Sequence, residues 1–237
     1  MNDKELLDLF FYKSNEVMKS HGILHISERE IDGKHPLSFY SEITDNRKKL
    51  TDLPLFLYED LFFFSNDLIH FTIYLFILRP FINDSRKEKG TYFQNWYDAR
   101  YLSYASILHS SVYNFWDRVG DLLNCFFETG LPKENVYIGR VLSNFPNESK
   151  DSMYYQELSD IYTNHVKNIV FDRNEDAHNQ SIVTSHYYGI ILKHGEDQDK
   201  MTEIKFGLPE IFKGQIEYAN RGFELALRLI EEKGHAK

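Results

Sequence analysis

Apolar residues recur at alternating steps of three and four along most of the chain, a spacing typical of helices that bury one face in a bundle. One long stretch opens at Pro54, a favoured residue of a first helical turn, and another is closed by Gly130 and Pro132. The pattern predicts helices at residues 3–20, 54–79, 91–129, 133–142, 151–171 and 208–233. We therefore expect an all-α protein built as an antiparallel helix bundle.

The same spacing predicts which side chains face the core. In the first helix Phe10 is expected to point inward, and in the helix over 151–171 His165 is. The inward positions of the two clearest seams are Ala105, Leu108, Val112, Phe115, Val119, Leu122 and Phe126, and then Phe212, Ile216, Ala219, Phe223, Ala226 and Ile230.

Two segments depart from the helical spacing. Residues 21–52 are interrupted by breakers such as Pro36, and we expect mostly loop or irregular structure there. At residues 181–207 the stretches Tyr188–Leu192 and Glu203–Phe206 flank a polar turn. This arrangement favours a small β-hairpin inserted before the last helix, with a frayed helix as the alternative.

Composition fits a single folded domain. At 42% hydrophobic residues the chain can bury a substantial core, so it is not of the disordered class. The lone cysteine, Cys125, excludes a disulfide framework. We expect one domain over 1–237, with its core at about 54–233, an N-terminal extension at 1–53 and an insertion at about 181–207.

Net charge and hydropathy disfavour some classes of function. The formal net charge of −9 disfavours a general nucleic-acid binder, because such affinity comes largely from neutralising phosphates. A nuclease of this charge would need a local basic cleft. The start of the chain is acidic and mixed, unlike a signal peptide, and the longest uninterrupted apolar run, Phe71–Leu78, is too short to cross a bilayer. We expect a cytoplasmic protein with no membrane partner.

The stretch with the most distinctive chemistry is Asp172–His178, which lies between two predicted helices. Arg173 can grip a phosphate with two parallel hydrogen bonds, and His178 can exchange a proton with a ribose hydroxyl near neutral pH. Asn174 adds a hydrogen-bonding amide. N–H groups at a helix start would add partial positive charge at the same place. Together these groups could cut RNA without a metal.

An arginine, a polar residue and, after three more residues, a histidine, between helices of an all-helical domain, resemble the active-site motif of the HEPN superfamily, here Arg173, Asn174 and His178. The resemblance covers about residues 54–233. It implies a metal-independent endoribonuclease with no cofactor, whose active site forms in the cleft of a homodimer and whose partner is RNA. Many members act as toxins, in phage defence or in RNA processing. Toxins that pair with nucleotidyltransferase antitoxins usually carry Tyr where this chain has Gln180, so an antitoxin partner is left open.

A polar stripe on the helix over 91–129 gives a second candidate. Asn114, Asp117, Arg118 and Asp121 recur at helical spacing beside the apolar seam. One interpretation is a solvated helix face. In the other, Asp117 or Asn114 orients the motif's arginine or histidine from the neighbouring helix; HEPN domains are similar in placing a polar or acidic residue there.

Alternative functions stay open because an Arg-x(4–6)-His pattern is short. Arg29 with His35, and Arg228 with His235, also match it. The motif could be a surface arginine with a capping histidine. The chain could also be a non-catalytic HEPN-like module that binds a nucleotide, RNA or a protein through the same groove.

A di-iron site is the metal alternative. Asp67-x-x-His70 and Glu175-x-x-His178 have the carboxylate-x-x-His spacing of di-iron bundles, but one pair uses Asp and no clean inward Glu is evident on the other long helices. We therefore predict no metal.

Overall fold

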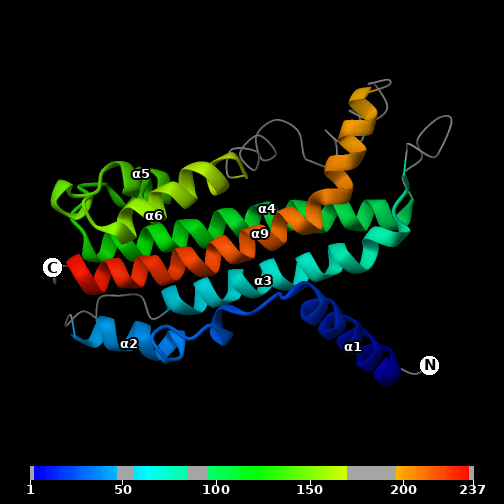
Figure 1. Ribbon diagram of the computed structural model, residues 1–237, viewed down its shortest axis with the longest axis horizontal. Coiled ribbons are helices and arrows are strands. Elements are labelled where there is room, and N and C mark those ends of the chain that lie inside the picture. The colour runs from blue at the N-terminus through cyan, green and yellow to red at the C-terminus, as the bar shows by residue number, and fades with distance from the viewer. Residues whose placement is uncertain (1–2, 47–55, 85–94, 170–195, 235–237) are drawn as a thin grey trace.

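The computed structural model describes residues 3–46, 56–84, 95–169 and 196–234. Three long helices form its centre: α3 (Phe56–Leu78), α4 (Trp96–Phe126) and α9 (Glu196–Lys233). They pack lengthwise against one another (Figure 1). The prediction of an all-α bundle is confirmed.

Shorter helices cover this centre on two sides. α5 (Ile138–Ser143) contacts α4, and α6 (Met153–Ile161) contacts α9, above the bundle in Figure 1. On the other side, α1 (Asp3–His21) contacts α3 and α2 (Pro36–Asn46) contacts α9. Single 3₁₀ turns lie at Ile26–Glu28, Arg79–Phe81, Lys133–Asn135 and Asn147–Ser149.

The predicted seams form the core. Every residue predicted to face inward between Ala105 and Phe126, and between Phe212 and Ile230, is buried. Small residues allow close approach where the helices meet. A Cβ on Gly222 would lie 2.3 Å from the Trp116 ring, which is itself fully buried. The step of three and four therefore identified the buried faces of α4 and α9 correctly.

Several expectations were wrong. Pro36 does not break the chain but begins α2, because proline suits a first helical turn and Phe39, Tyr40 and Ile43 share one buried face. Residues 21–52 are thus partly helical, and the structure describes none of 47–52. Phe10 is 38% exposed rather than inward.

His165 was also expected to be buried and is instead exposed, because it lies in a π-helical turn, Tyr162–Val166 (η5), that shifts the facing of the residues after α6. Its ring stacks on Tyr218 at the surface, with ring centroids 4.3 Å apart.

The predicted β-hairpin is corrected as well. Glu203–Phe206 belongs to α9, which begins at Glu196, whereas Tyr188–Leu192 lies outside the described residues. Thr202, Lys205 and Leu208 are buried at helical spacing, which a strand could not achieve. Pro209 lies inside α9, and the first turns of the helix are turned away from its remaining length (Figure 1).

One helix of the described residues meets the length and hydropathy of a membrane span. Leu57–Phe81 has a mean hydropathy of 1.6 over its most apolar window, of which 44% is buried. It packs against both α4 and α9, so its apolar character also fits a central core helix.

A buried polar network fixes the start of α4. Asn95 caps the helix by accepting a hydrogen bond from the Asp98 backbone N–H at 2.8 Å. The Asp98 carboxylate accepts from the Lys205 ammonium at 2.9 Å, and neither side chain is exposed. The Lys205 ammonium also donates to the Asn83 carbonyl at 2.7 Å. The end of α3, the start of α4 and the first part of α9 are thereby tied together.

Candidate functional site

Arg173, Asn174 and His178 lie outside the described residues, which stop at 169 and resume at 196. The structure therefore does not test their predicted roles, nor the di-iron alternative through Glu175. It does describe the helical segments on each side, α6 with its π turn before the motif and α9 after it. It also describes Asp117 and Asn114.

Asp117 lies half-buried on α4. Burial raises the pKa of its carboxyl to about 6, the neighbouring Asp121 charge acts in the same direction, and hydrogen bonds from the Tyr113 hydroxyl and the Ile138 backbone N–H oppose the rise. A carboxyl with a pKa near 6 can hold or release a proton close to neutral pH. The surroundings of Asp117 therefore favour its protonated form more than those of an exposed aspartate do.

The Arg118 charge also lowers the pKa of Asp117, but it is the smallest of these effects. The Arg118 guanidinium pairs with Asp121 on the next turn and lies 3.2 Å from the Asp60 carboxylate of α3. Two of the four residues of the polar stripe, Arg118 and Asp121, therefore belong to an ion-pair group at the surface, which fits the interpretation as a solvated helix face. Asn114 is half-buried one turn before Asp117.

The Ile138 N–H that binds Asp117 opens α5, and two glycines let the chain pack closely there. A Cβ on Gly120 of α4 would lie 2.8 Å from the Ile138 nitrogen, and one on Gly139 would lie 2.5 Å from the Tyr162 hydroxyl oxygen. Tyr162 begins the π turn, and the Asp117 charge contributes to its raised pKa, after burial. Asp117 is therefore part of a corner that joins α4, α5 and the π turn.

Beyond this corner, α5 and the segment from α6 through the π turn border a cavity of about 440 Å³, which we call the polar cleft. Hydroxyl groups of Ser143, Ser159 and Thr163 line it, and Arg140 and Lys167 supply positive charge. In the described part of the chain neither cation forms an ion pair. Lys167 is six residues before Arg173, so the cleft lies on the segment that leads into the motif.

The chemistry of the polar cleft suits a phosphate chain. The two cations and the Thr163 hydroxyl can donate hydrogen bonds to phosphate oxygens, and the Arg140 guanidinium is held 5.2 Å from the centre of the Tyr137 ring. π turns within helices are frequent at functional sites. A nuclease with a net charge of −9 would need a local basic site, and this cleft carries two cations.

The sequence did not single out Arg140, Lys167 or Tyr162, which border the polar cleft. A signal was present, since Tyr155, Ser159 and Tyr162 recur at helical spacing on one face. It could not be joined to Arg140, because the contact between α5 and α6 depends on the loop between them.

Comparison with known proteins gives one family. The family model described as Cthe2314-like HEPN matches residues 68–231, which include the Arg173–His178 motif, Asp117 and the polar cleft. No curated protein and no solved structure gives a match.

Proposed function

The chain belongs to the HEPN superfamily, and on that premise we propose that it is a metal-independent endoribonuclease. The observation that carries the proposal is the motif Arg173-Asn174-x-x-x-His178 inside the matched region. HEPN domains are commonly ribonucleases that dimerise and bind RNA. The proposed active site therefore lies in a cleft between two copies of the chain.

In the proposed reaction His178 takes the proton of a ribose 2′-hydroxyl. The 2′-oxygen then attacks the adjacent phosphorus, and the bond to the 5′-oxygen of the next nucleotide breaks. That oxygen takes a proton from the His178 imidazolium or from water as it leaves, so the products are a 2′,3′-cyclic phosphate and a 5′-hydroxyl end. Arg173 stabilises the charge that builds on the phosphate, and Asn174 holds the phosphate or the imidazole by a hydrogen bond.

Two described features support this assignment. The polar cleft offers Arg140 and Lys167 to the RNA backbone on the segment before the motif. Asp117 and Asn114 lie on α4. The Asp117 carboxylate accepts a hydrogen bond from the Ile138 backbone N–H, and its charge contributes to the raised pKa of Tyr162 in the π turn. We assign Asp117 and Asn114 as positioning residues for the motif, and Asp117 as a group that can also buffer a proton.

The biological setting we propose is the cytoplasm, in a toxin–antitoxin or phage-defence system. RNA is the substrate, a second copy of the chain completes the site, and an antitoxin protein would keep the nuclease silent. Expression of the parent should then arrest growth, and expression of His178→Ala should not.

The test compares cleavage of mixed-sequence RNA in EDTA by the parent and two variants. His178→Ala should lose at least about a hundredfold in rate, the range attributed to general acid–base catalysis. His35→Ala is the matched control, because His35 is exposed and, with the half-buried Arg29, forms another Arg-x(4–6)-His pattern before α2. It should cleave like the parent.

Each outcome bears on a separate part of the proposal. Equal cleavage by His178→Ala and the parent would remove His178 from catalysis. Loss of all cleavage in EDTA would contradict the metal-independent mechanism. RNA binding by the parent without cleavage would favour the non-catalytic module, the second candidate that the acidic net charge supports.

A further inference from the structure

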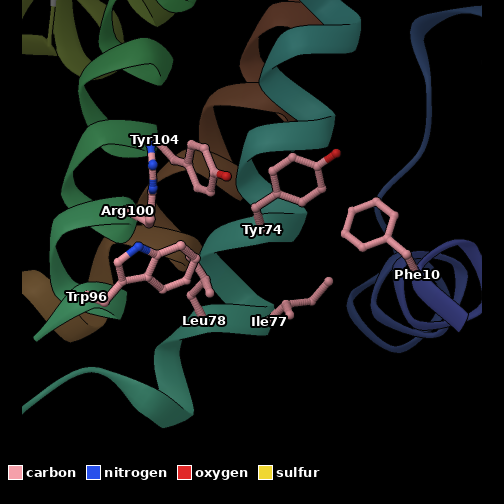
Figure 2. Close-up of a pocket in the computed structure, with 7 residues that line it drawn as sticks. All are labelled: Phe10, Tyr74, Ile77, Leu78, Trp96, Arg100 and Tyr104. Carbon is pink, nitrogen blue, oxygen red and sulfur yellow. The ribbon is translucent and has the colours of Figure 1, made fainter. Parts of the chain in front are cut away.

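A second cavity, of about 240 Å³, opens between α1, α3 and the first turns of α4. Phe10 comes from α1, Tyr74 from α3, and Trp96, Arg100 and Tyr104 from α4 (Figure 2). We call this the aromatic pocket. None of these residues borders the polar cleft, and Phe10 precedes the residues that the family model matches.

Ring groups surround the aromatic pocket from several directions. Tyr74 and Tyr104 lie with ring centroids 5.4 Å apart, and Phe10 meets Tyr74 edge to face at 5.2 Å. Trp96 stands across the opening from them (Figure 2) and is 64% exposed. The other tryptophan, Trp116, is fully buried, so the exposure of Trp96 is not general to this residue type here.

The cation in the pocket is Arg100, a solvent-exposed residue. The Arg100 guanidinium carbon lies 5.5 Å from the centre of the Trp96 ring, and in the described residues it forms neither an ion pair nor a hydrogen bond. By contrast, Arg79, Arg118, Arg221 and Arg228 all pair with carboxylates. Because Arg100 is exposed and pairs with no carboxylate among the described residues, its guanidinium beside the Trp96 ring is available to an anion that enters the pocket.

The wall that carries Trp96 and Arg100 is held firmly. Trp96 is the first residue of α4, directly after the Asn95 cap, and the buried Asp98–Lys205 pair lies one turn below. The Asn95 side-chain amide also donates to the Phe81 carbonyl at 3.0 Å. A binding wall fixed in advance loses less conformational entropy when a ligand arrives.

We propose that the aromatic pocket binds one nucleotide, with the base stacked on the rings of Trp96 and Tyr104 and a phosphate on Arg100. Flat ring faces with an adjacent guanidinium are the groups that recognise a base and its phosphate in single strands. The cavity is smaller than the roughly 300–1,000 Å³ typical of drug-sized ligands, which fits one base. The nucleotide can be free or part of an RNA strand. Neither Arg173 nor His178 takes part, so the proposal goes beyond the proposed cleavage.

Tryptophan fluorescence tests it directly, because Trp96 is exposed in the pocket and buried Trp116 supplies a constant background. The full chain carrying His178→Ala, which should leave RNA intact, is titrated with AMP, adenosine, ribose 5-phosphate and a six-nucleotide uridine strand. AMP or the strand should quench Trp96 saturably, adenosine should bind about tenfold more weakly than AMP, and ribose 5-phosphate should not quench. Quenching by AMP assigns a free nucleotide, and quenching by the strand alone assigns RNA.

Two neighbouring phenylalanines provide a matched pair of variants. Phe10→Ala removes a wall of the pocket, whereas Phe11 is 62% exposed and does not line it. Phe10→Ala and Arg100→Gln should each weaken binding about tenfold, and Phe11→Ala should bind like the parent. Circular dichroism and Tm show that each variant is folded.

Four results would overturn the proposal. They are quenching by no ligand, equal quenching by ribose 5-phosphate and AMP, equal weakening by Phe10→Ala and Phe11→Ala, and ligand-free quenching that grows with protein concentration. The last would make the pocket a contact between copies of the chain. None of these readings depends on cleavage, so a failure here leaves the nuclease proposal untouched.

Discussion

Helix α4 carries two aspartates in contrasting surroundings, Asp98 near its start and Asp117 in its second half. Near its start, Asp98 is completely buried and bound to Lys205, whose ammonium is also completely buried. Five turns later, Asp117 is half-buried, and what binds it is a tyrosine hydroxyl and a backbone N–H. A carboxylate paired with a buried lysine serves the architecture, whereas one solvated by neutral donors can exchange a proton. The difference teaches that the partner, not the residue type, decides the function.

The largest effect is expected from breaking the first of these sites. Lys205→Met leaves Asp98 buried without its cation, and removing one member of a buried pair costs about 3–5 kcal/mol. The free energy of unfolding from urea titration should fall by that amount. The control is Lys213→Met on the same helix, whose ammonium is 3.8 Å from Glu217 in a partly exposed pair, and which should cost less than about 0.5 kcal/mol. Equal losses in the two variants would contradict the structural role of Asp98.

Gly120→Ala tests how closely α4 and α5 pack in the corner around Asp117. A Cβ there would lie 2.8 Å from the Ile138 backbone nitrogen, so α5 must move away from α4. The free energy of unfolding should fall by about 2 kcal/mol, within the cost of overpacking. Gly207→Ala, in α9 with nothing near its Cβ, should instead gain up to about 1 kcal/mol from helix propensity. A harmless Gly120→Ala would show that this corner is loosely packed.

His109 lies between the two aspartates along α4, and the shift of its pKa has burial as its cause. Burial against neighbours such as Phe212 lowers its pKa to about 4, below the value of 6.5 in an unfolded chain. The unfolded chain then binds the proton more tightly, so stability falls as the pH drops from 6.5 towards 4. At pH 5 the loss is about 2 kcal/mol relative to neutral pH. In His109→Phe the difference between pH 7 and pH 5 should shrink by this amount, and an unchanged difference would refute the assignment.

Asp117→Asn should change the pH dependence of the free energy of unfolding in the opposite direction and by a smaller amount. The folded-state pKa of about 6 lies above the ordinary 3.8, so the protonated carboxyl favours the folded state below pH 3.8 and that benefit is lost as the pH rises through 6. Removing the charge should raise stability at pH 7 relative to pH 4 by about 1 kcal/mol, after allowance for solvent screening at a half-buried site. The pH profile of RNA cleavage should also lose an inflection near 6. A merely structural Asp117 would change stability and leave that profile alone.

The sequence by itself determined the helical class and the buried faces of the long helices. Residues such as Leu108, Val112 and Phe115 repeat over many turns, and only a helix can bury all of them. It also determined the motif around Arg173 and its family, since the motif is local in sequence. Over short segments the pattern failed. At Glu203–Phe206 alternation favoured a strand, but the segment is helical, and Lys205 packs inward against Asp98, which is more than a hundred residues away in the sequence.

Only the tertiary structure decided which polar groups meet. Asp117 stood out as one of a stripe, yet its raised pKa depends on burial by other segments, and the Ile138 N–H of another helix opposes the rise. Arg140 and Lys167 form one cleft, although nothing in either segment predicts the other. Spacing along a chain reports which face of a helix is apolar, whereas the neighbours that set a charge come from segments whose approach depends on the whole packing.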